Sequence, residues 1–196
     1  MHPELLSMSL FMLVTSCSPG PNNIVASYSG FNFGVLKTIP HMCGVIFGFT
    51  TLVTIMNFGL VNVFQKYPII QEILKYTGTL FLIYLAYKIS FSKTSSGTEK
   101  KNPVKFIETF FFQFINPKSV IVSVIMVSTY VDRGNDFLFY SFWVIGIAFL
   151  FAIISINFWT LVGKFLRRFA TNEKFIKRFN YVMSLLLLAC IATFYL

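Results

Sequence analysis

The residues best suited to bind a ligand lie in a short polar stretch of the first apolar segment: Pro19, Gly20, Pro21, Asn22 and Asn23. A proline inside a helix removes a backbone hydrogen bond and clashes with the preceding turn. The stretch therefore predicts that one half-helix ends near Ser18 and another begins near Asn22. The second half-helix offers unpaired N–H groups and a positive dipole end, whereas the first offers free carbonyl oxygens. One helix end suits an anionic group and the other a cationic group.

A second stretch of the same kind, Asn116-Pro117-Lys118, interrupts a later apolar segment. Pro117 lies 98 positions after Pro19, which is half of the 196-residue chain. Lys118 is expected in the first turn of a half-helix, where its charge opposes the dipole unless an anion binds between them. The alternative is that Lys118 extends to a lipid headgroup, but a position near the middle of the bilayer makes that reach long.

These two stretches together predict a binding site for a small zwitterion, such as an amino acid. Its carboxylate is expected toward Asn22 and Asn23, and its ammonium toward the carbonyls of residues 15–18. The predicted substrate-binding residues are Pro19, Gly20, Pro21, Asn22, Asn23, Asn116, Pro117 and Lys118. No catalytic residue, metal ligand or cofactor site is predicted.

The elements that must position these residues are membrane helices. The chain is 56% hydrophobic and only 12% charged, whereas a soluble domain carries about 25% charged residues. A membrane-spanning helix needs about 20 apolar residues, and six segments qualify: 5–31, 38–63, 68–90, 106–131, 137–163 and 176–196. The longest polar connection, about 92–105, is too short to hold a soluble catalytic domain. We therefore predict an all-α integral membrane protein with one domain over 1–196.

The spacing of the two proline stretches predicts an inverted repeat. Each half, about 1–98 and 99–196, contains three predicted spans with the first one broken. Because three is an odd number, the two halves must enter the membrane from opposite sides. Broken segments at matching positions of inverted halves indicate a transporter's binding site near the bilayer midplane. The alternative is that prolines kink membrane helices without a function, and we assign the lone Pro40 to that alternative.

Charges set the predicted orientation. The net charge is +9, and the basic residues concentrate in alternate connections rather than along a stripe that would bind nucleic acid. Basic residues in short loops mark the cytoplasmic side. With six spans, both termini are then predicted outside the cytoplasm.

Other polar residues give weaker signals. No acidic residue falls near a predicted midplane, so the sequence does not identify a proton carrier. His41 can titrate, but we expect a histidine at a helix end. Asn57 and Asn157 are expected to bond across helices, and the glycines at 30, 34, 44 and 48 to permit close packing. Cys17, Cys43 and Cys190 are expected to be buried apolar thiols that form neither a disulfide nor a metal site.

Four sequence motifs resemble those of a known family: "SPGPNNIVAS", "GVLKTIPHMCGVIFGF", "LKYTGTLFLIYLAYKI" and "FFFQFINPKSVIV". In this combination the chain resembles the LysE/RhtB family of amino-acid exporters over nearly its whole length. The doubled asparagine, "QFIN" and "INFWTLVGKFLRRF" most resemble its cysteine/O-acetylserine exporter branch.

The resemblance implies a secondary exporter of amino acids or derivatives in the bacterial inner membrane, driven by the proton motive force. Neutral or sulfur-containing substrates are expected, such as cysteine and O-acetylserine or homoserine and threonine. A passive channel for small polar metabolites and a membrane scaffold remain as alternatives, and homo-oligomers are left open. An intramembrane enzyme lacks support, since neither an H-E-x-x-H nor a G-x-S-x-G motif occurs.

Overall fold

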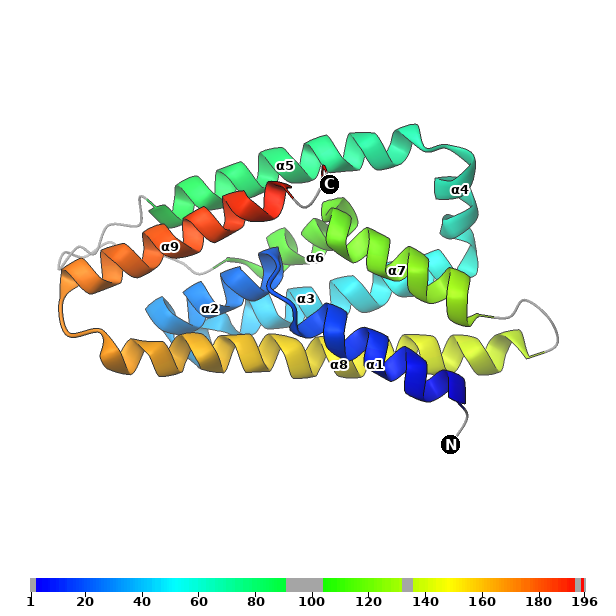
Figure 1. Ribbon diagram of the computed structural model, residues 1–196, viewed down its shortest axis with the longest axis horizontal. Helices are drawn as coiled ribbons and strands as arrows, with labels where there is room; N and C mark the ends of the chain where they lie inside the picture. Colours follow the sequence, from blue (N-terminus) through cyan, green and yellow to red (C-terminus); the bar gives the residue numbers. More distant parts are fainter. Residues whose placement is uncertain (1–2, 91–103, 132–135, 193–194, 196) are drawn as a thin grey trace.

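Helices form the regular structure of the protein (Figure 1), seen in a computed structural model that describes residues 3–90, 104–131, 136–192 and 195. Residues 92–103 of the predicted polar connection lie outside the described residues. The elements, in chain order, are α1 (Pro3–Cys17), α2 (Pro21–Phe33), α3 (Val35–Ile55), a π-helical turn η1 (Met56–Leu60), α4 (Val61–Lys66), α5 (Ile69–Ser90), α6 (Phe106–Ile115), α7 (Pro117–Tyr130), α8 (Phe137–Leu166), a 3-10 turn η2 (Arg167–Phe169) and α9 (Glu173–Ala192).

Both predicted breaks are present. The first separates α1 from α2 at residues 18–20, and the second separates α6 from α7 at Asn116 with a bend of 61°. Pro21 and Pro117 each open the helix that follows their break, as the missing N–H of proline favours. In Figure 1, α1 runs from the right-hand end to the middle and α2 continues to the left, while α6 and α7 follow the opposite course.

Some of the predicted spans have the length and hydropathy expected of membrane helices. In the described part of the chain, three helices do so: α3 with its continuation (Val35–Val63), α8 with η2 (Phe137–Phe169) and α9. The bent pair α6 and α7 makes a fourth if it counts as one span. The segments 5–31 and 68–90 are helical but are not in this group. The first is divided by its break, and α5 carries Glu72, Lys75 and Lys88.

The span predicted over 38–63 is not a uniform helix. A π-helical turn follows α3, and Gly59 within it has a φ of 136°, a conformation that favours glycine. Asn57 in this turn is buried, and its Nδ2 donates to Ser141 Oγ at 2.8 Å. The predicted bond across helices is confirmed for Asn57, whereas Asn157 donates to the carbonyl of Ile153 in its own helix.

Glycines bring the central helices into close contact. A Cβ on Gly30 would lie 2.2 Å from the carbonyl oxygen of Thr160, and one on Gly163 would lie 2.0 Å from that of Ser27, so α2 and α8 pack backbone to backbone. Gly44 and Gly48 serve α3 and α6 in the same way. The packing prediction was wrong for Gly34, which contacts nothing at its Cβ position and instead has a φ of 80° at the turn between α2 and α3.

Candidate functional site

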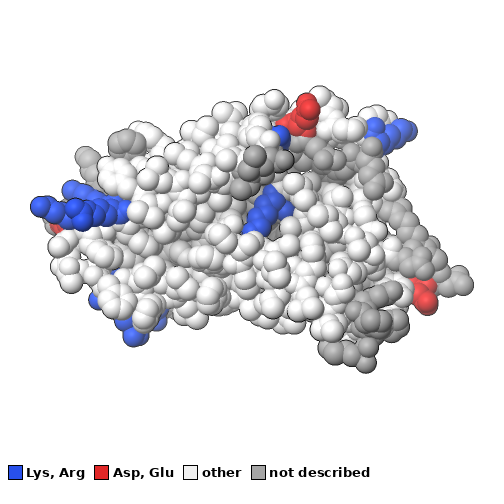
Figure 2. Space-filling model, viewed as in Figure 1, with Lys and Arg blue, Asp and Glu red and all other residues white. Residues whose placement is uncertain are grey.

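A cavity of about 70 Å³ lies where the two breaks meet. This volume holds a few water molecules or a small polar molecule. It is lined by residues of α1, the first break, α2, α3, α6, the second break, α7 and α8: Thr15, Ser16, Gly20, Pro21, Asn22, Asn23, Val45, Phe49, Gln113, Asn116, Lys118, Ser119, Val122, Ala152, Ser155 and Ile156. On the face shown in Figure 2, most basic side chains lie toward the ends of the long axis, one lies at the upper edge beside an acidic side chain, and one lies in a hollow near the middle.

Six of the eight predicted binding residues line this cavity: Gly20, Pro21, Asn22, Asn23, Asn116 and Lys118. Pro19 and Pro117 are not among the lining residues. Their place is in the breaks themselves, where Pro19 keeps the chain out of helix and Pro117 begins α7. The structure therefore brings together polar residues that lie almost 100 positions apart in the sequence.

The carbonyl end of α1 is covered by donors from two other helices, α2 and α8. Asn23 Nδ2 donates to the carbonyl oxygens of Ser16 at 2.8 Å and Ser18 at 2.9 Å. Ser155 Oγ of α8 also donates to the Ser16 carbonyl, at 2.7 Å. Asn23 is buried, so its side chain joins the two halves of the broken helix.

The charged group at this helix end is the ammonium of Lys118. Its Nζ donates to the carbonyl oxygen of Ser18 at 3.1 Å and to Ser18 Oγ at 2.8 Å. The end of the lysine side chain lies against Gly20, where an added Cβ would be 2.9 Å from Nζ. The ion pair found among the described residues joins Lys88 and Glu108, so Lys118 has none there. Its ammonium occupies the place predicted for a substrate ammonium, at the carbonyls of residues 15–18.

The N-terminus of α2 faces the cavity without a side-chain cap. Gly20 is the N-cap residue and forms no side-chain hydrogen bond, and Pro21 has no N–H to satisfy. The backbone of Asn22 and Asn23 therefore forms the first turn, where the helix dipole favours an anionic group.

The side chains of Asn22 and Gln113 connect the two halves of the chain. Asn22 Nδ2 donates to Gln113 Oε1 at 2.8 Å, and Gln113 Nε2 donates back to Asn22 Oδ1 at 3.1 Å. Ser119 Oγ also donates to Gln113 Oε1, at 3.0 Å, and accepts from Asn116 Nδ2 at 3.0 Å. The amide of Asn22 is thus a link between α2 and α6 as well as a cavity wall.

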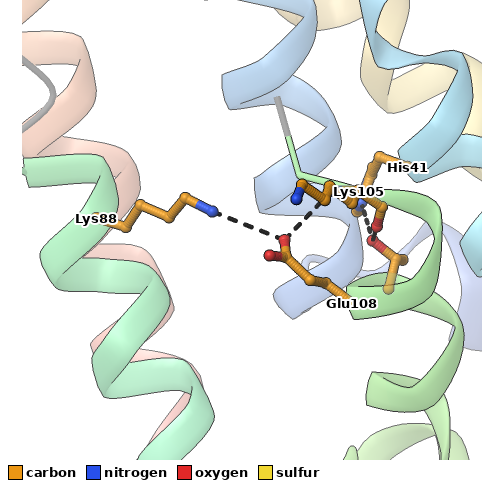
Figure 3. A network of polar contacts seen from close by, with 5 residues as sticks. His41, Lys88, Lys105 and Glu108 are labelled. Atoms are coloured by element: carbon orange, nitrogen blue, oxygen red, sulfur yellow. Dashed lines mark hydrogen bonds and ion pairs between the residues drawn. The ribbon is translucent and has the colours of Figure 1, made fainter. Parts of the chain in front are cut away.

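The prediction for His41 was wrong. His41 lies inside α3 rather than at a helix end, and its side chain is only 2% exposed. Its Nδ1 is 2.9 Å from Thr109 Oγ1, and its Nε2 is 3.2 Å from the carbonyl oxygen of Asn22. Figure 3 shows it beside Lys105 and Glu108, where the Lys105 N–H donates to Glu108 Oε2 at 3.2 Å and Lys88 lies 3.6 Å from that oxygen. His41 therefore connects α3 to α2 and α6 and is not among the residues that line the cavity.

Three lining residues with hydrogen bonds across the site are absent from the predicted set: Gln113, Ser119 and Ser155. A signal existed for Gln113, because a buried amide in the run "FFFQF" has to find a partner within the membrane. Ser119 and Ser155 offered no such signal, since serine in a membrane helix commonly bonds to its own backbone.

A polar cavity lined by broken apolar helices is the arrangement of a helical membrane transporter. Among the described residues, no group of three or more His, Cys, Asp or Glu could hold a metal ion. The site offers hydrogen-bond donors, acceptors and one ammonium, which suit the binding of a small charged molecule.

Sequence comparison gives the family. The sequence profile of the LysE type translocators matches residues 13–195. The chain is also 30% identical over 198 aligned positions, 97% of each chain, to proteins named cysteine/O-acetylserine efflux protein from Escherichia coli strain K12 and from Shigella sonnei strain Ss046. No solved structure matches. The chain belongs to the LysE family of amino-acid efflux transporters and is not an enzyme.

Proposed function

We propose that this protein is a six-span, inverted-repeat exporter of a neutral or sulfur-containing amino acid or derivative. The substrates proposed are cysteine and O-acetylserine, or homoserine and threonine. Export crosses the bacterial inner membrane and is driven by the proton motive force. The relatives named cysteine/O-acetylserine efflux proteins support this substrate class.

The observation that carries the proposal is the shared cavity of the two breaks. Residues from both halves line it, including Asn22 and Asn23 from the first and Asn116 and Lys118 from the second. The two broken pairs run in opposite directions (Figure 1). Opposed broken helices around one polar cavity are the geometry by which inverted-repeat transporters alternate access to a single site.

The chemistry of the cavity fits a small zwitterion. The uncapped first turn of α2 attracts a carboxylate, and the carbonyl end of α1 attracts an ammonium, as its contact with Lys118 illustrates. The apolar side chains of Val45, Phe49 and Val122 also line the cavity, which favours a short uncharged substrate side chain over a second charged group.

The proposed orientation puts both termini outside the cytoplasm. The basic residues of α8, η2 and α9 gather near the connection between these helices, including Lys164, Arg167, Arg168 and Lys174. Such a cluster favours the cytoplasmic side. A reporter that is active only in the cytoplasm, fused to Leu196, should therefore give no signal.

Radiolabelled efflux from cells that overexpress the protein tests the function. Cysteine, O-acetylserine, threonine, homoserine and lysine are compared with an empty-vector control, and faster loss of the sulfur-containing or neutral compounds is expected. Equal retention of all five would contradict the proposal. Efflux that persists after the proton gradient collapses, at a rate linear in concentration, would instead identify a passive channel.

A further inference from the structure

Lys118 differs from every other residue in the wall of the cavity. Among the described residues that line it, Lys118 alone carries a charge. Its ammonium is neutralised by no carboxylate in the described part of the chain and is held by the carbonyl and hydroxyl oxygens of Ser18. An ammonium has three N–H donors, and these two contacts account for two of them.

The acceptors at Ser18 form one position for a cation. They lie at the C-terminal end of α1, where the helix dipole adds negative potential. The Ser16 carbonyl accepts from Asn23 and Ser155, and the Ser18 carbonyl accepts from Asn23 as well as from Lys118. Lys118 is the charged donor among these, so a substrate ammonium can take its place only when Lys118 leaves. A substrate ammonium and the Lys118 ammonium therefore compete for Ser18.

We propose that Lys118 is the proton-carrying group of the exporter and that its ammonium and the substrate ammonium alternate at Ser18. This inference rests on the proposed function. When an amino acid enters from the cytoplasm and its ammonium binds Ser18, the displaced lysine releases a proton to cytoplasmic water. Two ammonium groups in a small cavity repel each other strongly, which favours that release.

The return step restores the contact seen in the structure. After the amino acid leaves on the outer side, the neutral amine of Lys118 takes a proton from external water and binds Ser18 again. Each cycle moves one zwitterion outward and one proton inward, and no covalent bond other than the N–H bond forms or breaks. The exchange therefore needs no further reactant.

No other titratable group in the described structure is as well placed. The groups that face the Lys118 ammonium are the thiols of Cys17 on α1 and Cys190 on α9. The lining residues from α3, α6 and α8 do not titrate. His41 lies behind the cavity with both ring nitrogens in contact with protein atoms.

The neighbouring residues allow the lysine to move. The end of its side chain passes over Gly20, which has no side chain to confine it. Lysine has a flexible four-carbon stem, so its amine can leave Ser18 without a change in the backbone of α7. The two halves of the chain meet at this contact, because Ser18 ends the first half-helix and Lys118 begins the second of its pair.

The test uses the full chain reconstituted in liposomes with the membrane potential clamped at zero. Exchange of labelled for unlabelled amino acid is measured first, with cysteine, O-acetylserine, threonine, homoserine and lysine. A gradient of one pH unit is then applied, and the wild type should sustain about a tenfold concentration ratio, as expected for one proton per amino acid. Lys118→Gln has no amine to take up a proton, so it should sustain a ratio of about one, whatever its own rate of exchange.

Two further variants frame this result. Lys118→Arg carries a permanent charge, should remain bound to Ser18, and should lose both exchange and the response to pH. Lys174→Gln removes an exposed lysine at the start of α9 and should match the wild type in both assays.

Several outcomes would overturn the inference. A Lys118→Gln protein that still sustains the tenfold ratio would show that another group carries the proton. A Lys118→Gln protein that loses exchange altogether would show that Lys118 serves binding or folding instead. Absence of exchange by the wild type with all five amino acids would contradict the proposed function itself. Substrate added to purified wild-type protein in weak buffer should release protons; no release would overturn the inference without any variant.

Discussion

The two breaks differ in how they satisfy the helix that follows them. At the second break, Asn116 caps α7 by accepting from the Lys118 N–H at 3.2 Å, and its amide donates to Ser119. At the first break, Gly20 precedes α2 and supplies no side-chain cap. One helix start is closed by its own residues, and the other is left open to the cavity.

This difference assigns separate tasks to segments that look alike in the sequence. The first break offers an uncapped helix start and a carbonyl end, which are the parts that can hold a ligand. The second break is internally bonded and contributes one charged group, the Lys118 ammonium, to the carbonyl end of the first. The pseudo-symmetry of the proposed repeat is therefore one of backbone, while the chemistry is divided between the halves.

The largest effect is expected from removing the first break, so that α1 and α2 form one continuous helix. An interior proline costs a helix about 3 kcal/mol relative to alanine, so Pro19→Ala combined with Pro21→Ala allows α1 to continue into α2 and removes both helix ends from the cavity. We expect loss of amino-acid efflux with normal amounts of protein in the membrane.

The matched control for this double variant is Pro40→Ala. Pro40 lies inside α3 and is exposed, so its removal should leave efflux unchanged. Normal efflux from the double variant would show that the first break is not needed for transport.

A smaller effect is expected from removing the N-cap of α7 at the second break. Asn116→Ala removes the cap of α7 and should lower the free energy of unfolding by about 1 kcal/mol. Thermal unfolding in detergent measures this change. Asn116→Ser retains a capping oxygen and should recover most of the stability; equal stability of the alanine and wild-type proteins would remove the distinction between the two breaks.

The smallest effect is expected at the link between the breaks. Single and double alanine variants of Asn22 and Gln113 form a thermodynamic cycle. Their reciprocal amide contact should give a coupling energy of about 0.6 kcal/mol, the average found for hydrogen bonds between membrane helices. Additive losses in the double variant would mean that the contact does not hold the two halves together.

The positions of the breaks were predictable because proline acts through local geometry. Pro19 and Pro21 interrupt the first segment and Pro117 begins α7, as the missing N–H of proline requires. The two proline stretches lie half a chain length apart, which indicated a repeat whose broken segments meet. The cavity is lined by residues from both breaks.

The partners within the site were not predictable in this way. Whether Lys118 faces an anion or the Ser18 carbonyl depends on how α1 and α7 approach, which is set by long-range packing rather than by residue spacing. The same holds for Gln113 and Ser155, whose partners lie 91 and 139 positions away. The π-helical turn at 56–60 was not predicted either, and Asn57 within it bonds to Ser141, which lies 84 positions away.

Protection of a cysteine in the cavity tests the central claim most directly. With the native cysteines replaced, Val122→Cys places a thiol in the cavity wall, and Ile121→Cys places one on the exposed side of the same helix. The protecting ligand is whichever of O-acetylserine, threonine, homoserine or lysine the efflux assay identifies. At ten times its dissociation constant, maleimide labelling of the Val122→Cys protein should slow about tenfold, because the rate follows the unoccupied fraction. Labelling of the Ile121→Cys protein should not change. Equal labelling of the Val122→Cys protein with and without the amino acid would contradict a substrate site between the two breaks.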